Sequence, residues 1–232
     1  MPAIRLYDLA GADPERRFSP FCWRTKLALA HKGLTVDTLP WRFTDKDAIA
    51  FSGQGRVPVL IDGDTTVVDS WAIAVYLETQ YPDRPSLFGG DIGMSVTRFL
   101  NAWTDKVVHP ALAQLVISDI HAHVAPQDRA YFRTTREQVF GRPLEEISAG
   151  RDEAVLIFRQ ALEPLRAVLQ YQPYVAGAHP AYADYIVFGA FQWARCISPF
   201  KLLADDDPVA AWRMRMLNAF NGLAAGALGY PV

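Results

Sequence analysis

The spacing of apolar residues along the chain changes near residue 84. Before that point, short runs of apolar and β-branched residues alternate with stretches of helical spacing, and after it nearly every stretch has helical spacing. Pro, Gly and Asp, which interrupt regular structure, are concentrated between the two parts. This pattern predicts a first domain at residues 1–83, a linker at 84–92 and a second domain at 93–232.

The first domain is predicted to be α/β, in the order strand, helix, strand, irregular segment, strand hairpin, helix. The expected strands are residues 4–9, 36–39, 57–61 and 65–68, and the expected helices run from Ser19-Pro20 to about Lys32 and from Asp69-Ser70 to about Tyr81. Asp62-Gly63 separates two β-rich runs, which favours a tight hairpin. Residues 41–56 have no clear periodicity.

The second domain is predicted to be all-helical. Three stripes of apolar residues have helical spacing: Val96, Phe99, Leu100, Trp103 and Val107; Val155, Phe158, Leu162, Leu165 and Leu169; and Val209, Trp212, Met216, Phe220 and Leu223. Residues 183–197 are apolar on every side, which is typical of a helix in the middle of a bundle.

Composition and charge narrow the class of protein. Half of the 232 residues are hydrophobic, 21% are charged and the formal net charge is −2, so no basic surplus favours a nucleic-acid partner. No apolar run reaches the roughly 20 residues that a membrane span needs. The two distant cysteines, Cys22 and Cys196, do not form a disulfide framework. We therefore expect a cytoplasmic protein.

Ser19-Pro20 lies between a predicted strand and a predicted helix. Ser is a favoured N-cap and Pro a favoured first helical residue, so an ordinary helix cap explains the pair. The same hydroxyl, at the positive end of the helix, could also stabilise a thiolate carried by a ligand. These two residues alone leave both interpretations open.

Two later pairs suit a peptide ligand. Val57-Pro58 opens a β-rich run, where a proline indicates an edge, a turn or a cis peptide and leaves the backbone before it free to pair with a ligand. Asp69-Ser70 opens the next helix, where a carboxylate suits an ammonium group and a hydroxyl with free N–H groups suits a carboxylate. A strand-start proline and a helix cap are the plain alternatives.

In this order and spacing, the motifs resemble those of the glutathione transferases. The residues that carry the resemblance are Ser19-Pro20-Phe21-Cys22, residues 55–60 (GRVPVL), residues 69–77 (DSWAIAVYL), Tyr81-Pro82-Asp83 and Tyr182-Ala183-Asp184-Tyr185. The resemblance extends over nearly the full length. It implies a thioredoxin-like first domain (βαβ-ββα), an all-helical second domain, glutathione as co-substrate and a homodimer.

The resemblance also implies roles for single residues. Ser19 would hold the glutathione sulfur, and Val57, before a Pro58 expected to be cis, would pair its backbone with the cysteinyl unit. Asp69 and Ser70 would hold the γ-glutamyl end. Arg56 is the candidate for the glycyl carboxylate, although a solvated Arg is an equal alternative, and Lys46 and Gln54 are weaker candidates.

Within the superfamily, several segments look like the bacterial β-aryl-etherases of lignin breakdown and related fungal enzymes of the Ser type. These segments are residues 19–26, 68–71, 126–129 and 183–185. In such enzymes, glutathione thiolate displaces an aryloxide from an ether carbon next to a ketone. One position departs from the family pattern: Ala181 stands where a Ser or Thr usually forms a capping box with Asp184.

Aromatic residues could line an apolar co-substrate pocket between the domains. The candidates are Phe21, Trp41, Phe43, Trp103 and Trp193, with Trp23 and Tyr182 as further possibilities. Plain core packing is the alternative for each of them. Trp41 and Phe43 stand out because they lie in the irregular segment and on no periodic stripe.

Two other functions compete with the transferase. One is a non-enzymatic ligand-binding protein on the same fold. The other is a thiol-disulfide reductase based on Cys22, but that chemistry needs a nucleophilic cysteine at position 19, which is Ser. The five histidines are dispersed and match no metal-binding signature, so we expect no metal site.

Overall fold

The computed structural model describes residues 4–232 and has a mixed four-stranded sheet in its first domain. The strands are β1 (Ile4–Leu9), β2 (Val36–Trp41), β3 (Val59–Asp62) and β4 (Thr65–Val68), in the order β2-β1-β3-β4. The β1–β2 pair is parallel and the other two pairs are antiparallel. This is the predicted βαβ-ββα thioredoxin-like order.

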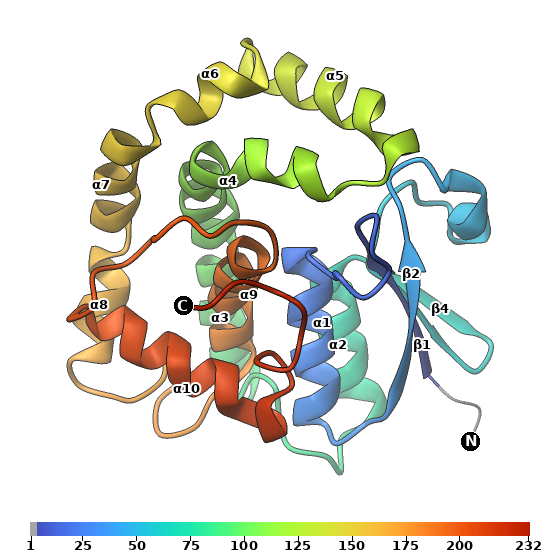
Figure 1. The fold of residues 1–232 in the computed structure, drawn as a ribbon. Coiled ribbons are helices and arrows are strands. Elements are labelled where there is room, and N and C mark those ends of the chain that lie inside the picture. Colours follow the sequence, from blue (N-terminus) through green and yellow to red (C-terminus); the bar gives the residue numbers. More distant parts are fainter. Residues whose placement is uncertain (1–3) are drawn as a thin grey trace.

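Helices cover both faces of the sheet. The helices α1 (Pro20–His31) and α2 (Ser70–Gln80) lie between the sheet and the helical domain, and the 3₁₀ helix η1 (Lys46–Ser52) lies on the opposite side (Figure 1). The irregular segment of the sequence analysis therefore contains one short helix. Its 3₁₀ geometry explains why no α-helical spacing was visible.

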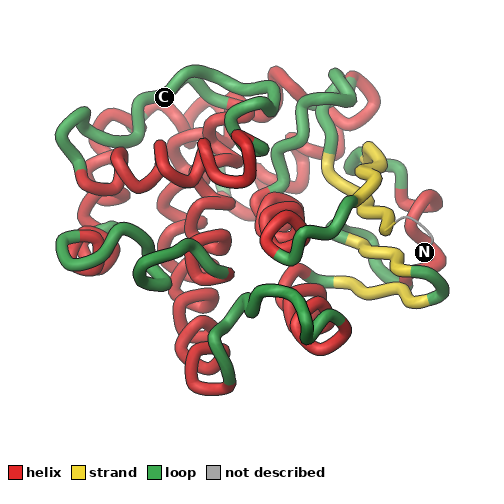
Figure 2. The backbone as a smooth tube through the Cα atoms, turned by 90° about the horizontal axis from the view of Figure 1, so that it is seen from below, coloured by secondary structure: helices red, strands yellow, loops and turns green. Residues whose placement is uncertain are grey.

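The second domain is all-helical, as predicted. Its elements are α3 (Asp91–Trp103), the π-helix η2 (Thr104–Val108), α4 (His109–His123), the 3₁₀ helix η3 (Pro126–Asp128), α5 (Arg129–Phe140), α6 (Leu144–Ala149), α7 (Arg151–Ala161), α8 (Glu163–Leu169), α9 (Tyr182–Ile197) and α10 (Pro208–Gly222). The first of these helices begins two residues before the predicted boundary at residue 93. Figure 2 shows the sheet at one end of the molecule and the helical domain beyond α1 and α2.

The three apolar stripes have different surroundings. The second and third begin in the core, where Val155 and Val209 are buried. Nearly all of α9 is buried, as its composition predicts. The first stripe is different: Val96 and Phe99 on α3 are 63% and 75% exposed, so helical spacing there does not mark a buried face.

The two domains meet mainly where α1 packs on α9. Gly189 permits this approach, because a Cβ at that position would lie 2.6 Å from the carbonyl oxygen of Pro20. Beside it, the buried guanidinium of Arg24 donates to Asn101 Oδ1 at 3.0 Å and to Asp105 Oδ1 at 2.7 Å. These contacts join α1 to the helix that runs from α3 into η2.

The start of α9 is capped without the Ser or Thr of the family pattern. The buried Asp184 carboxylate accepts hydrogen bonds from the N–H groups of Val175, Ala176 and Ala181 and from Trp212 Nε1, the last at 2.8 Å. Burial raises the pKa of Asp184, and these donors oppose that rise. The residue is therefore a structural anchor for the helical domain.

Candidate active site

The three sequence motifs meet at one end of the sheet, where β1 ends and β3 begins. Phe18 N–H donates to Leu9 O at 3.2 Å, which places Ser19 beside the end of β1. Val59 pairs with both Tyr7 and Val68. Residues 57–58, just before Val59, and residues 69–70, just after Val68, therefore meet near the same end of β1.

Ser19 is the N-cap of α1. Its Oγ accepts a hydrogen bond from Cys22 N–H at 3.2 Å, and Pro20 is the first helical residue. Because the oxygen is the acceptor in this bond, the hydroxyl proton is left to donate to a negative group. Ser19 is 4% exposed, and low-dielectric surroundings strengthen such a bond.

Cys22 has the properties of a core residue. It is fully buried. Burial and the nearby Asp8 carboxylate raise the pKa of its thiol well above the ordinary value, and the hydroxyl of Ser19 opposes this only in part. A thiol with a raised pKa supplies little thiolate, so the structure disfavours the thiol-disulfide reductase.

The Val57–Pro58 peptide bond is cis, as the resemblance implies. Pro58 is buried and Val57 is half-buried, and neither belongs to β3. Among the backbone hydrogen bonds of residues 4–232 that lie outside helices and strands, none uses Val57. Its backbone is therefore available to a ligand.

A cluster of basic residues lies next to this segment. Lys46 Nζ donates to Gly55 O at 2.6 Å, and Arg56 is exposed one residue further on. Arg136 of α5 is close enough that the charge of Arg56, together with the larger effect of burial, lowers the pKa of Arg136. Within the described chain, no acidic side chain pairs with Arg136. We call Lys46, Arg56 and Arg136 the basic cluster.

The structure therefore adds Arg136 to the candidates for holding a carboxylate. The sequence analysis missed it because no local motif marks an arginine in the middle of a helix. Only the packing of α5 against the segment that follows β2 brings it to the site, where its guanidinium lies over the rings of Phe43 and Phe132.

Asp69 is the N-cap of α2. Its Oδ1 accepts from the N–H groups of Trp71 at 2.9 Å and Ala72 at 3.1 Å, and its φ of 74° is rare for a residue other than glycine. Ser70 is buried, and its carbonyl oxygen accepts from the hydroxyl of Tyr182 at 2.7 Å. This bond fixes the start of α2 to α9.

Two of the five aromatic candidates come together near Ser19. The rings of Phe21 and Trp193 both contact His109, with ring centroids 5.3 and 6.0 Å apart. Burial and the charge of Arg24 lower the pKa of His109 to about 3, so the ring is neutral at physiological pH. His109 is thus a second residue that the sequence analysis did not select. Trp103 is half-buried and packs against the core.

The other two candidates lie in the first domain and its contact with α5. Trp41 is 3% exposed, and its indole N–H donates to Asp45 O at 2.7 Å. Phe43 is half-buried against Phe18 and Phe132. Phe43 is therefore more exposed to solvent than Trp41. Contact of either ring with a co-substrate stays a prediction.

The described residues contain no arrangement of side chains suited to a metal ion. Among residues 4–232, no group of three His, Cys, Asp or Glu side chains is arranged to hold a metal ion. None of the helices formed by these residues is long and apolar enough to cross a membrane.

The first domain has a mixed four-stranded sheet with a cis proline before β3, and the helical domain that follows packs on α1. These features define a two-domain protein with a thioredoxin-like first domain. The profile "Glutathione S-transferase, C-terminal domain" matches residues 95–214, more than half of the chain, and "Glutathione S-transferase, N-terminal domain" matches residues 18–80. The chain therefore belongs to the glutathione S-transferase family.

Known relatives support this assignment. The chain is 31% identical to glutathione S-transferase Z1 of Arabidopsis thaliana over 147 residues, which are 61% of this chain and 58% of that protein. It is 28% identical to glutathione S-transferase 4 of Zea mays over 229 residues, 97% and 89% of the two chains. It resembles the crystal structure of a glutathione S-transferase of Ceriporiopsis subvermispora in complex with glutathione, with a TM-score of 0.82, 25% identity and coverage of 94% and 96%.

Proposed function

We propose that the protein is a glutathione transferase that directs the thiolate of bound glutathione at an electrophilic, aromatic co-substrate. The observation that carries this proposal is the meeting of Ser19, Val57 and Asp69-Ser70 at one end of the sheet. The relative from Ceriporiopsis subvermispora, which binds glutathione, supports glutathione as the ligand.

Each part of glutathione has a partner in this proposal. Ser19 Oγ donates to the sulfur, and the backbone of Val57 pairs with the cysteinyl unit. Asp69 and Ser70 hold the ammonium and carboxylate of the γ-glutamyl end, and the basic cluster holds the glycyl carboxylate. Phe21, Trp193 and the neutral His109 form an aromatic wall for the co-substrate.

Thiol activation at Ser19 needs a modest effect. A thiol has a pKa of about 8.5, and lowering it by about two units makes it mostly ionised at neutral pH. Each unit corresponds to about 1.4 kcal/mol. One hydrogen bond to a thiolate and the positive end of α1 are sufficient for an effect of this size.

The test replaces Ser19 by Ala and by Thr. Ser19→Ala removes the donor and is expected to lower kcat at least about tenfold, while the Kd for glutathione at neutral pH rises by no more than about fivefold. The pKa of bound glutathione, followed by thiolate absorbance, should rise by about one to two units. Ser19→Thr keeps a hydroxyl and should retain most of the activity.

Thermal unfolding of both variants controls for the lost helix cap, since removal of a serine cap costs about 1 kcal/mol. If Ser19→Ala turned over several electrophiles at the rate of the unchanged protein, Ser19 would have no part in thiol activation. Glutathione binding without conjugation of any electrophile by the unchanged protein would instead favour the non-enzymatic ligand-binding function.

Cleavage of aryl ethers is the finer form of this proposal. The thiolate sulfur forms a bond to an ether carbon next to a ketone, the C–O bond breaks, and the aryloxide leaves and takes a proton from water. Its support is the sequence resemblance of residues 19–26, 68–71, 126–129 and 183–185. Release of a phenol from an α-aryloxy ketone, dependent on glutathione, tests it directly.

Two further features are proposed from the structure and the family. Both cysteines are free and buried, which supports a reducing cytoplasmic location. On α3, the exposed residues Ile92, Val96 and Phe99 follow an i, i+4, i+7 spacing and present one apolar face. We propose this face as the contact between two subunits of a homodimer.

A further inference from the structure

A cavity of about 580 Å³ lies in the helical domain, where α9 ends and α10 begins. It is bounded by the end of α9, the loop of residues 198–205, the first turns of α10 and residues 231–232. Its size falls within the range of small-molecule sites. None of the residues proposed to bind glutathione or the co-substrate lines it. The two sites share only the helix α9, which carries Trp193 on one side and Ala194 and Arg195 in the cavity lining.

The walls of this cavity are mostly apolar, and its charges are unbalanced. Leu202, Leu203 and Met214 line it, together with several Ala and Pro residues. The charged residues of its lining are Arg195, Lys201, Asp205 and Arg213. The single acid, Asp205, is exposed and already forms an ion pair with Lys201 at 2.7 Å.

Arg213 on α10 is the unusual member of this lining. It is 8% exposed, yet no carboxylate, carbonyl or hydroxyl oxygen of residues 4–232 receives a hydrogen bond or ion pair from its guanidinium. Its neighbours are the ring of Phe191, 5.7 Å from Cζ, and the second cation Arg195. Burial and the charge of Arg195 lower the pKa of Arg213 to about 10.

Arg195 differs from Arg213 because it has hydrogen-bond partners within the protein. Its guanidinium donates to the carbonyl oxygens of Ala224, Ala225 and Ala227 at 3.0 to 3.1 Å. By contrast, the smaller cavity beside α1 is lined by Arg17 and Lys26, which have the buried carboxylate of Asp8 at 3.9 and 2.7 Å. The charge of Arg213 lacks such a counter-charge. None of the guanidinium nitrogens of Arg213 is completely shielded from solvent, so the group is accessible to a ligand.

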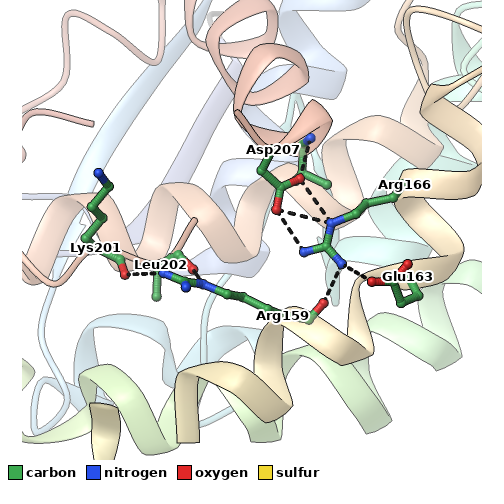
Figure 3. A network of polar contacts seen from close by, with 7 residues as sticks. Arg159, Glu163, Arg166, Lys201, Leu202 and Asp207 are labelled. Carbon is green, nitrogen blue, oxygen red and sulfur yellow. Dashed lines mark hydrogen bonds and ion pairs between the residues drawn. The ribbon is translucent and has the colours of Figure 1, made fainter. Parts of the chain in front are cut away.

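The cavity is held open by contacts outside it. Figure 3 shows Arg159 and Arg166 fixing the loop that forms one wall. Arg159 Nε donates to Leu202 O at 2.8 Å, and Arg166 Nη2 donates to Asp207 Oδ2 at 2.8 Å. Asp207 in turn caps α10, the helix that carries Arg213. The site is therefore preformed.

We propose that this cavity binds a small carboxylate with an apolar body, whose carboxylate pairs with the guanidinium of Arg213. The planar fork of an arginine matches both oxygens of a carboxylate. The apolar walls favour a hydrophobic body over a phosphate or a sugar. Because the lining is separate from the glutathione site, this ligand binds beside glutathione and does not compete with it.

The experiment measures binding of three probes, cinnamate, 3-phenylpropionate and decanoate, to the full chain by calorimetry. It is repeated with S-hexylglutathione present, and with cinnamamide, which has the shape of cinnamate without its charge. We expect at least one carboxylate to bind one-to-one, with or without S-hexylglutathione, and cinnamamide to bind at least about tenfold more weakly than cinnamate if cinnamate is that probe.

Two variants locate the site. Arg213→Met keeps much of the volume and removes the charge, so carboxylate affinity should fall at least about tenfold. Arg213→Lys keeps the charge without the fork and should have intermediate affinity. Thermal unfolding without ligand controls for the fold of both variants, since Arg213 makes no hydrogen bond or ion pair within residues 4–232 that the substitution would remove.

Either of two results would overturn the proposal. The first is that none of the three carboxylates binds up to about 5 mM. The second is that Arg213→Met binds the carboxylate as tightly as the unchanged protein does. Conjugation activity should be unchanged in Arg213→Met, so failure of this proposal is distinguishable from failure of the proposed transferase function.

Discussion

Ser19 and Asp69 occupy the same structural position, the N-cap of a helix, and each has binding capacity beyond its cap. The oxygen of Ser19 accepts one backbone hydrogen bond, which leaves its proton to donate. The Oδ1 of Asp69 accepts two, and the cap uses only that oxygen. A residue can therefore cap a helix and bind a ligand at once, so the two interpretations of each motif are compatible.

The substitution Asp69→Asn removes the negative charge of this side chain but keeps the oxygen that caps α2. Asn keeps the capping oxygen and tolerates the positive φ, so the free energy of unfolding should change by less than about 0.5 kcal/mol. Loss of the pairing with the ammonium group of glutathione should raise its Kd about 10- to 100-fold. Calorimetry with glutathione measures this. Asp64→Asn, in the exposed hairpin turn, is the control and should leave the Kd unchanged.

A second prediction at the residue scale concerns His109 and pH. Its pKa in the folded protein is about 3, against about 6.5 in the unfolded chain. Between these values the unfolded chain binds more protons, so stability falls as the pH falls below about 6.5. Asp105, 3.5 Å from the ring, is the nearest counter-charge, but it already pairs with Arg24 at 2.7 Å.

Urea unfolding at pH 7 and pH 5 tests this effect. The unchanged protein should lose up to about 2 kcal/mol through His109 over that interval. The side chain of Gln does not titrate, so the free energy of unfolding of His109→Gln should fall less over the same interval. The difference between the two proteins should be about 2 kcal/mol. An identical pH dependence in both proteins would mean that the pKa of His109 is the same in the folded and the unfolded chain.

At the scale of elements, η3 determines the path of the chain after β2. The buried carboxylate of Asp128 accepts from Phe43 N–H at 3.3 Å and Thr44 N–H at 3.0 Å, and from Thr44 Oγ1 at 2.6 Å. A residue of the helical domain thus satisfies the backbone of the irregular segment in the first domain. That segment carries Lys46 of the basic cluster, so this contact also positions part of the site.

Asp128→Asn is expected to destabilise the protein by about 2 kcal/mol, because the amide nitrogen faces a donor that then lacks an acceptor. Urea unfolding measures the change. Hydrogen exchange of residues 43–52 should become faster, whereas the strands should be less affected. The neighbouring Gln127→Ala, at an exposed position, is the control. Unchanged exchange in residues 43–52 would contradict this role.

At the scale of the whole molecule, the exposed face of α3 predicts the state of assembly. Ile92, Val96 and Phe99 are 84%, 63% and 75% exposed, which is unusual for a cluster of large apolar side chains. Burial of this face in a homodimer would remove it from water. The spacing alone showed an apolar stripe, and only the orientation of α3 in the tertiary structure shows that part of it faces outward.

Phe99→Glu places a charge in the middle of this face and should shift the protein from dimer to monomer. Sedimentation velocity across a range of concentrations measures the shift. Val139→Glu is the matched control, because Val139 of α5 is also 75% exposed but lies outside the face. Equal sedimentation of the two variants as dimers would place the subunit contact elsewhere.

Local patterns were sufficient for most of the fold. The bounds of β1 and β4, the starts of α1 and α2 and the buried helix α9 agree with the predictions, because alternation, helix caps and all-round apolar composition are properties of neighbouring residues. The cis bond at Pro58 was expected from the family resemblance, because the residues by themselves left an edge, a turn or a cis peptide open. Three of the motifs that form the candidate site are local signals of this kind.

The sequence by itself therefore determined the elements, the two-domain order and the residues Ser19, Pro58 and Asp69. Only the tertiary structure decided the surroundings of Arg136, His109 and Arg213, and the outward orientation of Phe99. The physical reason is that burial and unbalanced charge depend on which elements pack together. No spacing along the chain records that Arg213 lies near a second cation and pairs with no carboxylate of residues 4–232, because those neighbours come from other elements.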